Sequence, residues 1–237
     1  MRRRSWEGLY GPLWPGGPEV AWRTFPYEIG KAALDRLLAF MALLVLLPFL
    51  AAISLVVMVD SPGSPIFAQP RVGKDGRRFI LLKFRSMEAN SDDREYKAYI
   101  ERYVKEGAPY KEDPAGPVFK LVDDRRATRV GALLRRLDLD ELPQLINILK
   151  GDMSLVGPRP DIPEAVAMYE DWHKGRLAVT PGLTGPWQVN GRDRTPFDEM
   201  VRIDLDYIHR RSLGLDLKII LLTIPSVVKR ALRQREE

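Results

Sequence analysis

The 237-residue chain has no cysteine and only two histidines, His173 and His209. It therefore has no disulfide and no thiolate metal site, and too few histidines for a histidine-rich zinc site. Any metal should sit on oxygen ligands. The chain also lacks a Walker A loop, a GxSxG elbow, an HExxH helix and a GxGxxG fingerprint. These absences argue against the common nucleotide hydrolases and dehydrogenases.

Acidic residues are outnumbered, with 32 Asp and Glu against 37 Lys and Arg, which gives a net charge of +5. A basic chain favours anionic partners such as phosphorylated substrates, acidic lipid surfaces or nucleic acid. Because no nucleic-acid-binding motif accompanies the charge, we expect no nucleic-acid partner. The length suits one compact catalytic unit better than two domains.

Charge is missing altogether from residues 37–59, which read LLAFMALLVLLPFLAAISLVVMV. At ~1.5 Å per residue, a helix of this length crosses a hydrocarbon core of roughly 30 Å. A buried core helix is rarely this long, and a signal peptide needs a small-residue cleavage site where DSPGSP stands. The run therefore predicts membrane association.

Both flanks of this run are basic, and Pro48 lies in its middle. A single spanning helix should leave one flank less basic, so similar charge on both sides predicts that both ends stay in the cytoplasm. Pro48 removes a backbone donor and can bend the helix into a re-entrant hairpin. An ordinary Pro-kinked spanning helix is the alternative, because Ser54 is the only side chain in the run that hydrogen-bonds strongly. The flanking cations are Arg2, Arg3, Arg4, Arg23, Lys31 and Arg36 before the run, and Arg71, Lys74, Arg77, Arg78, Lys83 and Arg85 after it.

The remaining pattern predicts an α+β fold that is mainly helical. A β-hairpin is expected at residues 65–84, around the turn Lys74-Asp75-Gly76. Helices are expected at residues 91–106, 128–136, 140–149, 163–173 and 195–212. The chain then divides into an aromatic, Pro- and Gly-rich segment (1–30), the membrane helix (31–60) and a cytoplasmic, membrane-associated domain (61–237).

Three segments each keep two interpretations. Residues 1–30 fit either an interfacial aromatic belt or a disordered tail. Residues 107–117, rich in Gly and Pro, fit a surface connection or a mobile lid. Residues 215–234 fit an amphipathic helix lying in the membrane surface or one packed on the catalytic core.

Carboxylates and guanidiniums alternate most densely in residues 135–144 and 151–160. Asp140 and Glu141 fit the roles of nucleophile and magnesium ligand, and nearby arginines fit phosphate binding. The alternative is structural, with Asp140 as a helix N-cap and the arginines on a solvated face. A carboxylate at a helix N-terminus should have a depressed pKa and stay ionised. Pro158 and Pro160 should preorganise Arg159 for a diphosphate.

These motifs resemble those of the bacterial sugar transferases, the monotopic phosphoglycosyl transferases that start surface-glycan assembly on undecaprenyl phosphate. The resemblance runs from about Lys31 to the C-terminus, roughly six-sevenths of the chain. Its landmarks stand in family order: the Pro-broken apolar helix, DSPGSPIFAQPRVGKDG, LLKFRSM, DLDELPQLINILKGDMSLVGPRP, TPGLTGPWQVNGR, IDLDYI and LDLKIILLTIP.

The resemblance implies a re-entrant helix turning at Pro48 and a catalytic dyad at Asp140 and Glu141. Asp140 would attack the β-phosphate of a nucleotide sugar, a UDP-sugar by the family resemblance, and carry a covalent sugar-phosphate on to polyprenyl phosphate. Glu141, with Asp140, would bind Mg²⁺. The implied place is the cytoplasmic face of the inner membrane. Further site residues implied are Lys83, Arg135 and Arg159 as phosphate contacts, with Gln188, Arg192 and Asp204.

The chain departs from the family pattern at two places. The family's Thr-Ser-Leu-Asp-Glu is replaced by Leu137-Asp138-Leu139-Asp140-Glu141, and the added Asp138 charge should raise the pKa of the nucleophile. Leu47 precedes Pro48 where some members carry serine, which removes a hydrogen-bond partner from the break. The rival function is a non-catalytic membrane adaptor, and the intact dyad argues against it.

Overall fold

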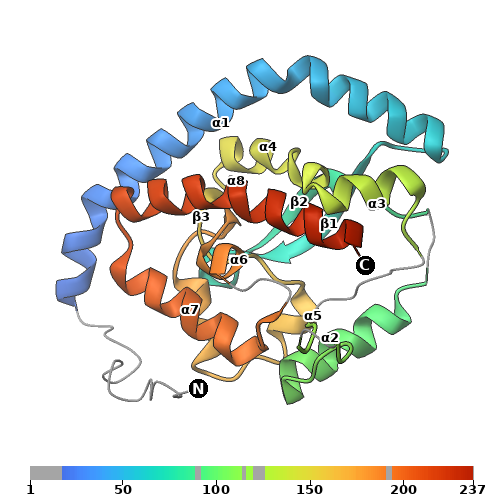
Figure 1. Cartoon of the computed structure of the whole chain (residues 1–237). Helices are drawn as coiled ribbons and strands as arrows, with labels where there is room; N and C mark the ends of the chain where they lie inside the picture. Colours follow the sequence, from blue (N-terminus) through green and yellow to red (C-terminus); the bar gives the residue numbers. More distant parts are fainter. Residues whose placement is uncertain (1–17, 89–91, 114–115, 120–125, 191–193, 237) are drawn as a thin grey trace.

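The computed structural model describes residues 18–88, 92–113, 116–119, 126–190 and 194–236. Most of the predicted segment 1–30 and the predicted site residue Arg192 therefore lie outside the described residues. Helices predominate, as expected, and pack around two small sheets (Figure 1).

Helix α1 (Pro18–Asp60) contains the whole uncharged run and stays helical through Pro48. Its Tyr27–Asp60 part contains an 18-residue window with a mean hydropathy of 2.9, yet only 11% of that window is buried within the protein. A core helix would be mostly buried, so this exposure favours contact with lipid. Figure 1 shows α1 arching over the body with a bend in its middle. Ser54 donates to the carbonyl of Leu50, within the helix.

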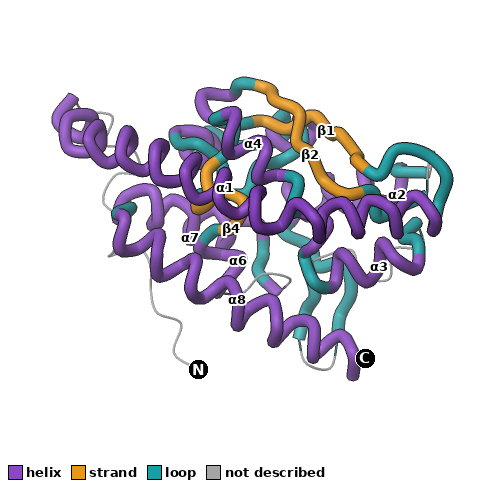
Figure 2. Tube along the Cα trace, turned by 90° about the horizontal axis from the view of Figure 1, so that it is seen from above, coloured by secondary structure: helices purple, strands orange, loops and turns teal. Residues whose placement is uncertain are grey.

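Both halves of α1 pack on the same body. In the first half, Ala39 joins a core with Leu145 and Ile148 of α4 (Gln144–Lys150). In the second half, Ile53 and Val57 pack with Phe84 and Leu134. Seen from above, α1 lies between the hairpin on one side and α8 (Leu213–Glu236) on the other (Figure 2).

The predicted hairpin is confirmed. Strands β1 (Ile66–Val72) and β2 (Arg78–Phe84) pair antiparallel around the 3₁₀ turn η2 (Lys74–Gly76). Asp75 adopts a left-handed conformation with φ 56°, which aspartate tolerates better than most residues. A second sheet was not expected. It consists of the short parallel strands β3 (Ser154–Val156) and β4 (Gly182–Thr184).

Four predicted helices are confirmed with small boundary changes: α2 (Arg94–Glu106), α3 (Arg129–Arg136), α4 and α7 (Phe197–Arg210). Thr128 caps α3 by accepting from the amide of Gly131. The helix predicted over residues 163–173 is wrong. Only α5 (Pro163–Val166) forms there, followed by turns and the 3₁₀ helix η4 (His173–Ala178), because Tyr169 and His173 turn inward to pack against Phe197.

Helix α8 confirms that residues 215–234 pack on the core, and it also has an apolar outer face. Its inner face packs on the core, where Ile219 joins Val156 and Tyr207. Its outer face leaves Leu217, Leu221 and Ile224 57–67% exposed. Helix α6 (Pro186–Asn190) lies between α7 and α8. The described part of residues 107–117 forms a bridge between Lys111 and Val118 rather than a free loop.

Candidate active site

The predicted dyad occupies the bend between α3 and α4. Asp138 turns the chain with φ 55°, and the 3₁₀ turn η3 (Leu139–Glu141) follows. Leu139 and Leu142 pack into the core beneath α1, which fixes the turn. Asp140 is therefore buried, with 7% exposure, inside the turn. It is not the N-cap of α4, a position that Pro143 takes, so the predicted N-cap role of Asp140 is wrong.

Arg159 joins the dyad from a distant part of the sequence. Its Nη1 and Nη2 donate to the two carboxylate oxygens of Glu141, at 2.9 and 2.5 Å. This two-pronged geometry is the strongest form of an arginine–carboxylate pair. The Arg159 side chain stays 32% exposed and that of Glu141 14%, so the pair is partly open to solvent. It is thus placed where a ligand can reach it.

The electrostatics of Asp140 differ from our prediction. Burial, followed by the Glu141 charge, raises the pKa of Asp140 to about 6. The predicted depression is wrong, because a three-residue turn gives little dipole stabilisation and the burial cost outweighs it. The predicted effect of Asp138 is in the right direction, since its charge also raises the pKa of Asp140. Asp140 is consequently a more basic carboxylate than an exposed one.

Two cations of the hairpin, Lys83 and Arg71, lie near enough to the dyad to interact with its charges. Lys83 of β2 is half-buried and lies with its Nζ 5.3 Å from the centre of the Phe67 ring. Burial, with the charge of Arg71, lowers the pKa of Lys83 to about 8, and the charges of Asp140 and Glu141 act against this. Arg71 of β1 was not predicted as a site residue. The dyad thus lies in a positive environment suited to phosphate oxygens.

The loop that carries Arg159 is held by more than its prolines. Arg71 donates to the carbonyl of Pro160 at 3.2 Å, and the amide of Val72 donates to the carbonyl of Asp161 at 3.0 Å. From the other side, Arg176 donates to the carbonyl of Arg159 itself at 3.1 Å. The preorganisation expected from Pro158 and Pro160 is thus reinforced by two arginines.

Arg176 is the centre of a buried polar network, with 2% of its side chain exposed. Its Nε donates to Asp204 at 2.8 Å, and its Nη1 donates to Asp161 and to the Tyr169 hydroxyl, both at 2.7 Å. Asp204 is fully buried. The structure therefore places this predicted site residue behind Arg159, at the far side of Arg176, and not beside the dyad.

The sequence also matches a known protein family. The model of the bacterial sugar transferases matches residues 26–230. The chain belongs to this family.

The curated relatives of this chain fall into two groups, shorter and longer proteins. The chain is 39% identical to the exopolysaccharide production protein ExoY of Sinorhizobium fredii, over 84% of this chain and 85% of the relative. It is 41% identical to the galactosyl transferase CpsE of Streptococcus agalactiae, over 86% of this chain and 43% of the relative. It is 40% identical to the UDP-glucose:undecaprenyl-phosphate glucose-1-phosphate transferase of Xanthomonas campestris, over 85% and 39%. The chain thus spans less than half of the two longer relatives.

The other predicted residues of this sugar transferase are spread around the dyad cluster. Arg135 is half-buried in the last turn of α3. Gln188 is buried in α6, where its side-chain amide donates to the carbonyl of Leu183. Pro48 is exposed in the middle of α1.

Sequence reasoning missed Arg71, Asp161, Tyr169 and Arg176. Arg71 and Asp161 do lie within or beside quoted motifs, and their neighbourhood was a usable signal. Arg176 and Tyr169 stand in no recognised motif, and only their contacts identify them.

Proposed function

We propose that this chain transfers a sugar-1-phosphate from a nucleotide sugar to a polyprenyl phosphate. The observation that carries the proposal is the adjacent Asp140 and Glu141, with Arg159 bonded to both carboxylate oxygens of Glu141, in a chain of this family. The names of relatives support the substrates, since the Xanthomonas protein is named for UDP-glucose and undecaprenyl phosphate, and a Salmonella typhimurium relative for undecaprenyl phosphate and galactose. Such a transfer would be the first membrane step in making a surface glycan such as an exopolysaccharide.

In the first half-reaction, an Asp140 carboxylate oxygen attacks the β-phosphorus of the nucleotide sugar. The bond from that phosphorus to the bridging oxygen breaks, and nucleoside monophosphate leaves with the electron pair. In the second half-reaction, a phosphate oxygen of the polyprenyl carrier attacks the same phosphorus and displaces Asp140. A pKa of about 6 leaves Asp140 mostly ionised at neutral pH and more basic than an ordinary carboxylate. Both properties favour a nucleophile.

Arg159 and Lys83 would neutralise the diphosphate in both half-reactions. The planar Arg159 guanidinium bonds both carboxylate oxygens of Glu141, and the same fork geometry matches two oxygens of a phosphate. Lys83, from a half-buried position, adds a point charge. Arg71 and Arg176 do not need to touch substrate, because they hold the backbone of residues 159–160.

We propose Mg²⁺ as the metal, held by Glu141 with Asp140. Among the described residues, no three or more His, Cys, Asp or Glu side chains lie close enough together to hold a metal ion without other ligands. Two adjacent carboxylates fit Mg²⁺, which commonly takes one or two carboxylates and fills its other positions with water and phosphate oxygens. Glu141 has lone pairs left beside its two bonds to Arg159. The ion would supply charge neutralisation to the diphosphate.

We also propose that α1 is re-entrant at Pro48 and that the catalytic body faces the cytoplasm from the inner membrane. Support comes from the basic charge on both flanks, the bend in α1, and the packing of both its halves on one body (Figure 1). A helix that crossed the bilayer would have to carry one of those packed halves to the far side.

The function is tested by incubating purified full-length protein with polyprenyl phosphate, Mg²⁺ and a panel of UDP-sugars, and measuring released UMP. We expect release with at least one sugar, abolished in Asp140→Asn and in Glu141→Gln. Asp171→Asn, on an exposed carboxylate, is the matched control and should keep full activity. A folded wild type that releases no UMP with any sugar would favour the adaptor function instead.

The topology is tested by cysteine labelling, which is clean because the chain has no cysteine. Ile29→Cys and Ser64→Cys place one exposed thiol on each side of the run. In oriented vesicles, a membrane-impermeant reagent should label both positions from the cytoplasmic side. Labelling of the two thiols from opposite sides would show a spanning helix.

A further inference from the structure

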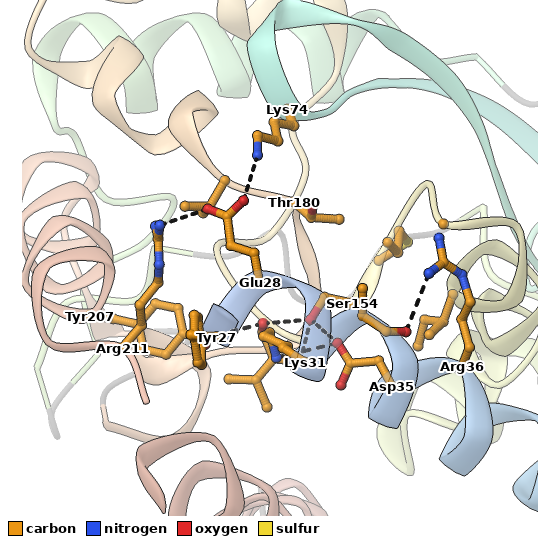
Figure 3. Close-up of a pocket in the computed structure, with 16 residues that line it drawn as sticks. Tyr27, Glu28, Lys31, Asp35, Arg36, Lys74, Ser154, Thr180, Tyr207 and Arg211 are labelled. Atoms are coloured by element: carbon orange, nitrogen blue, oxygen red, sulfur yellow. Dashed lines mark hydrogen bonds and ion pairs between the residues drawn. The ribbon is translucent and has the colours of Figure 1, made fainter. Parts of the chain in front are cut away.

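A second cavity lies away from the dyad, beside the N-terminal half of α1. Its volume is about 190 Å³, and its walls come from α1, the hairpin turn η2, β3, residues 179–180 and the end of α7 (Figure 3). None of the described residues assigned to the catalytic site lines it. The cavity is therefore separate from the site proposed for the transfer.

Most charges at this cavity are paired with each other. Lys31 lies between two carboxylates, 3.3 Å from Asp35 and 2.9 Å from Asp216. The Asp35 carboxylate also accepts from the hydroxyl of Ser154, and that of Asp216 accepts from Tyr27 and Tyr207. This network pairs the charged groups at the bottom of the cavity and links α1 to β3 and α8.

The rim is left with more positive than negative charge. Glu28 is shared by two cations, Lys74 at 3.3 Å and Arg211 at 2.9 Å. Arg36 has no carboxylate within 4 Å in the described part of the chain. Its one hydrogen bond there is a long contact of 3.4 Å to the carbonyl of Ala32. With Asp216 included, four cations face three carboxylates, which leaves the site complementary to a monoanion.

The Arg36 guanidinium packs over Gly151 at the wall of the cavity. A Cβ added at Gly151 would meet Nη2 of Arg36 at 2.5 Å. Gly151 has φ 85°, so glycine is favoured at this position on two grounds. Thr180 faces the same cavity (Figure 3) and can offer its hydroxyl to an anion. An arginine fork and a hydroxyl together suit a phosphate group.

The position of Arg36 indicates which kind of phosphate compound fits. Arg36 is the last charged residue before the uncharged run of residues 37–59. The neighbouring Leu37, Leu38 and Met41 are 43–58% exposed on the same helix. A compound with a phosphate in the cavity can lay hydrocarbon chains against these side chains, whereas a soluble phosphate leaves them uncovered.

We propose that this cavity binds the head group of an anionic phospholipid, with Arg36 as the principal contact for its phosphate. The site is distinct from the place where the polyprenyl carrier would react at Asp140. The proposal depends on the membrane placement of α1 and not on sugar-phosphate transfer, so each can fail without the other.

Native mass spectrometry of the full-length protein in detergent tests the site, with no nucleotide sugar present. Phosphatidylglycerol is the probe, and phosphatidylcholine and glycerol 3-phosphate are comparison ligands. We expect one saturable phosphatidylglycerol per chain and at least tenfold weaker binding in Arg36→Gln. Lys218→Gln is the matched control, because Lys218 is an exposed cation of α8 outside the cavity. It should bind like wild type.

Three results would overturn the proposal. Equal weakening by Lys218→Gln would mean diffuse attraction to a basic surface. Equal binding of phosphatidylcholine would mean that the cavity does not select an anion, and equal competition by glycerol 3-phosphate would mean a soluble phosphate site. If Arg36→Gln fails to fold, judged by its melting curve, Arg36→Lys keeps the charge without the fork and should bind more weakly than wild type.

Discussion

Two arginine–carboxylate clusters of this protein, one around Arg159 and one around Arg176, are neighbours but differ in their exposure to solvent. Arg159 and Glu141 are 32% and 14% exposed, and they leave room for a ligand. Arg176 and Asp204 are 2% and 0% exposed, and their partners are all within the protein. The two clusters meet at one hydrogen bond, from Arg176 to the carbonyl of Arg159. The comparison teaches that similar charged pairs differ in accessibility: the open pair is the one we propose for chemistry, and the closed pair has only partners within the protein.

The largest effect on stability is expected for Arg176→Met, in the closed cluster. Removing the buried cation leaves Asp204 and Asp161 without compensation, so the free energy of unfolding should fall by about 3–5 kcal/mol. Thermal melting in detergent measures the loss. Arg210→Met is the control, because its pair with Asp206 on the same helix is exposed and should contribute about 0–1 kcal/mol. Equal melting temperatures for the two variants would contradict the architectural role of Arg176.

Arg159→Lys tests the open cluster. Lysine keeps the charge but loses the fork that grips two oxygens at once, so kcat/KM should fall on the order of 100-fold. The melting temperature should stay within a few degrees of wild type, because the pair is partly solvated. UMP release and a melting curve measure the two effects, with Arg210→Lys as the control. Full activity in Arg159→Lys would remove Arg159 from the site.

Asp140→Asn should stabilise the protein while abolishing activity. Folding raises the pKa of Asp140 to about 6 from a usual value near 3.8. Ionisation therefore costs the folded state more, and native stability is lost as pH rises between about 4 and 6. Asparagine avoids this, so the variant should gain at most about 3 kcal/mol above pH 6 and little near pH 4.

Melting curves without Mg²⁺ at pH 4.5 and 7.5 measure this gain. Asp171→Asn, at a fully exposed position, should show no gain at either pH. A gain for Asp140→Asn of the same size at both pH values would show that Asp140 is not held in an unfavourable ionised state.

The smallest expected effect is that of Tyr169→Phe. It removes one hydroxyl that bonds both Asp161 and Arg176 and leaves the ion pairs in place. Stability should fall by roughly 1–2 kcal/mol, while kcat stays within about twofold of wild type. Denaturation and UMP release check the two parts. A large loss of activity with unchanged stability would assign Tyr169 to the open cluster instead.

Local sequence was sufficient for several features. The hairpin followed from Lys74-Asp75-Gly76, which supplies a turn residue that tolerates positive φ between two apolar runs. The polar helix predicted over residues 91–106 forms as α2, Arg94–Glu106. The dyad was recognisable because Asp140 and Glu141 are adjacent in a dense motif. Each of these features depends on residues close in the chain, and local backbone preferences decide them.

Contacts between distant residues decided the rest. The helix predicted over residues 163–173 fails because Tyr169 and His173 are drawn into a core with Phe197. The parallel pairing of Ser154 with Gly182 joins strands too short to have a recognisable pattern. Arg176 appears in sequence as one basic residue among many, and its role exists only through Asp161, Asp204 and the carbonyl of Arg159.

The sequence by itself determined that this protein has an uncharged helix of membrane length, a basic surround and an acidic dyad within a recognisable set of motifs. The tertiary structure alone decided that Asp140 has a raised pKa, that Arg159 is aligned on Glu141, and that Arg36 faces a cavity. The reason is physical: burial and the distance between charges set pKa values and partners, and both are properties of the packed chain rather than of neighbouring residues.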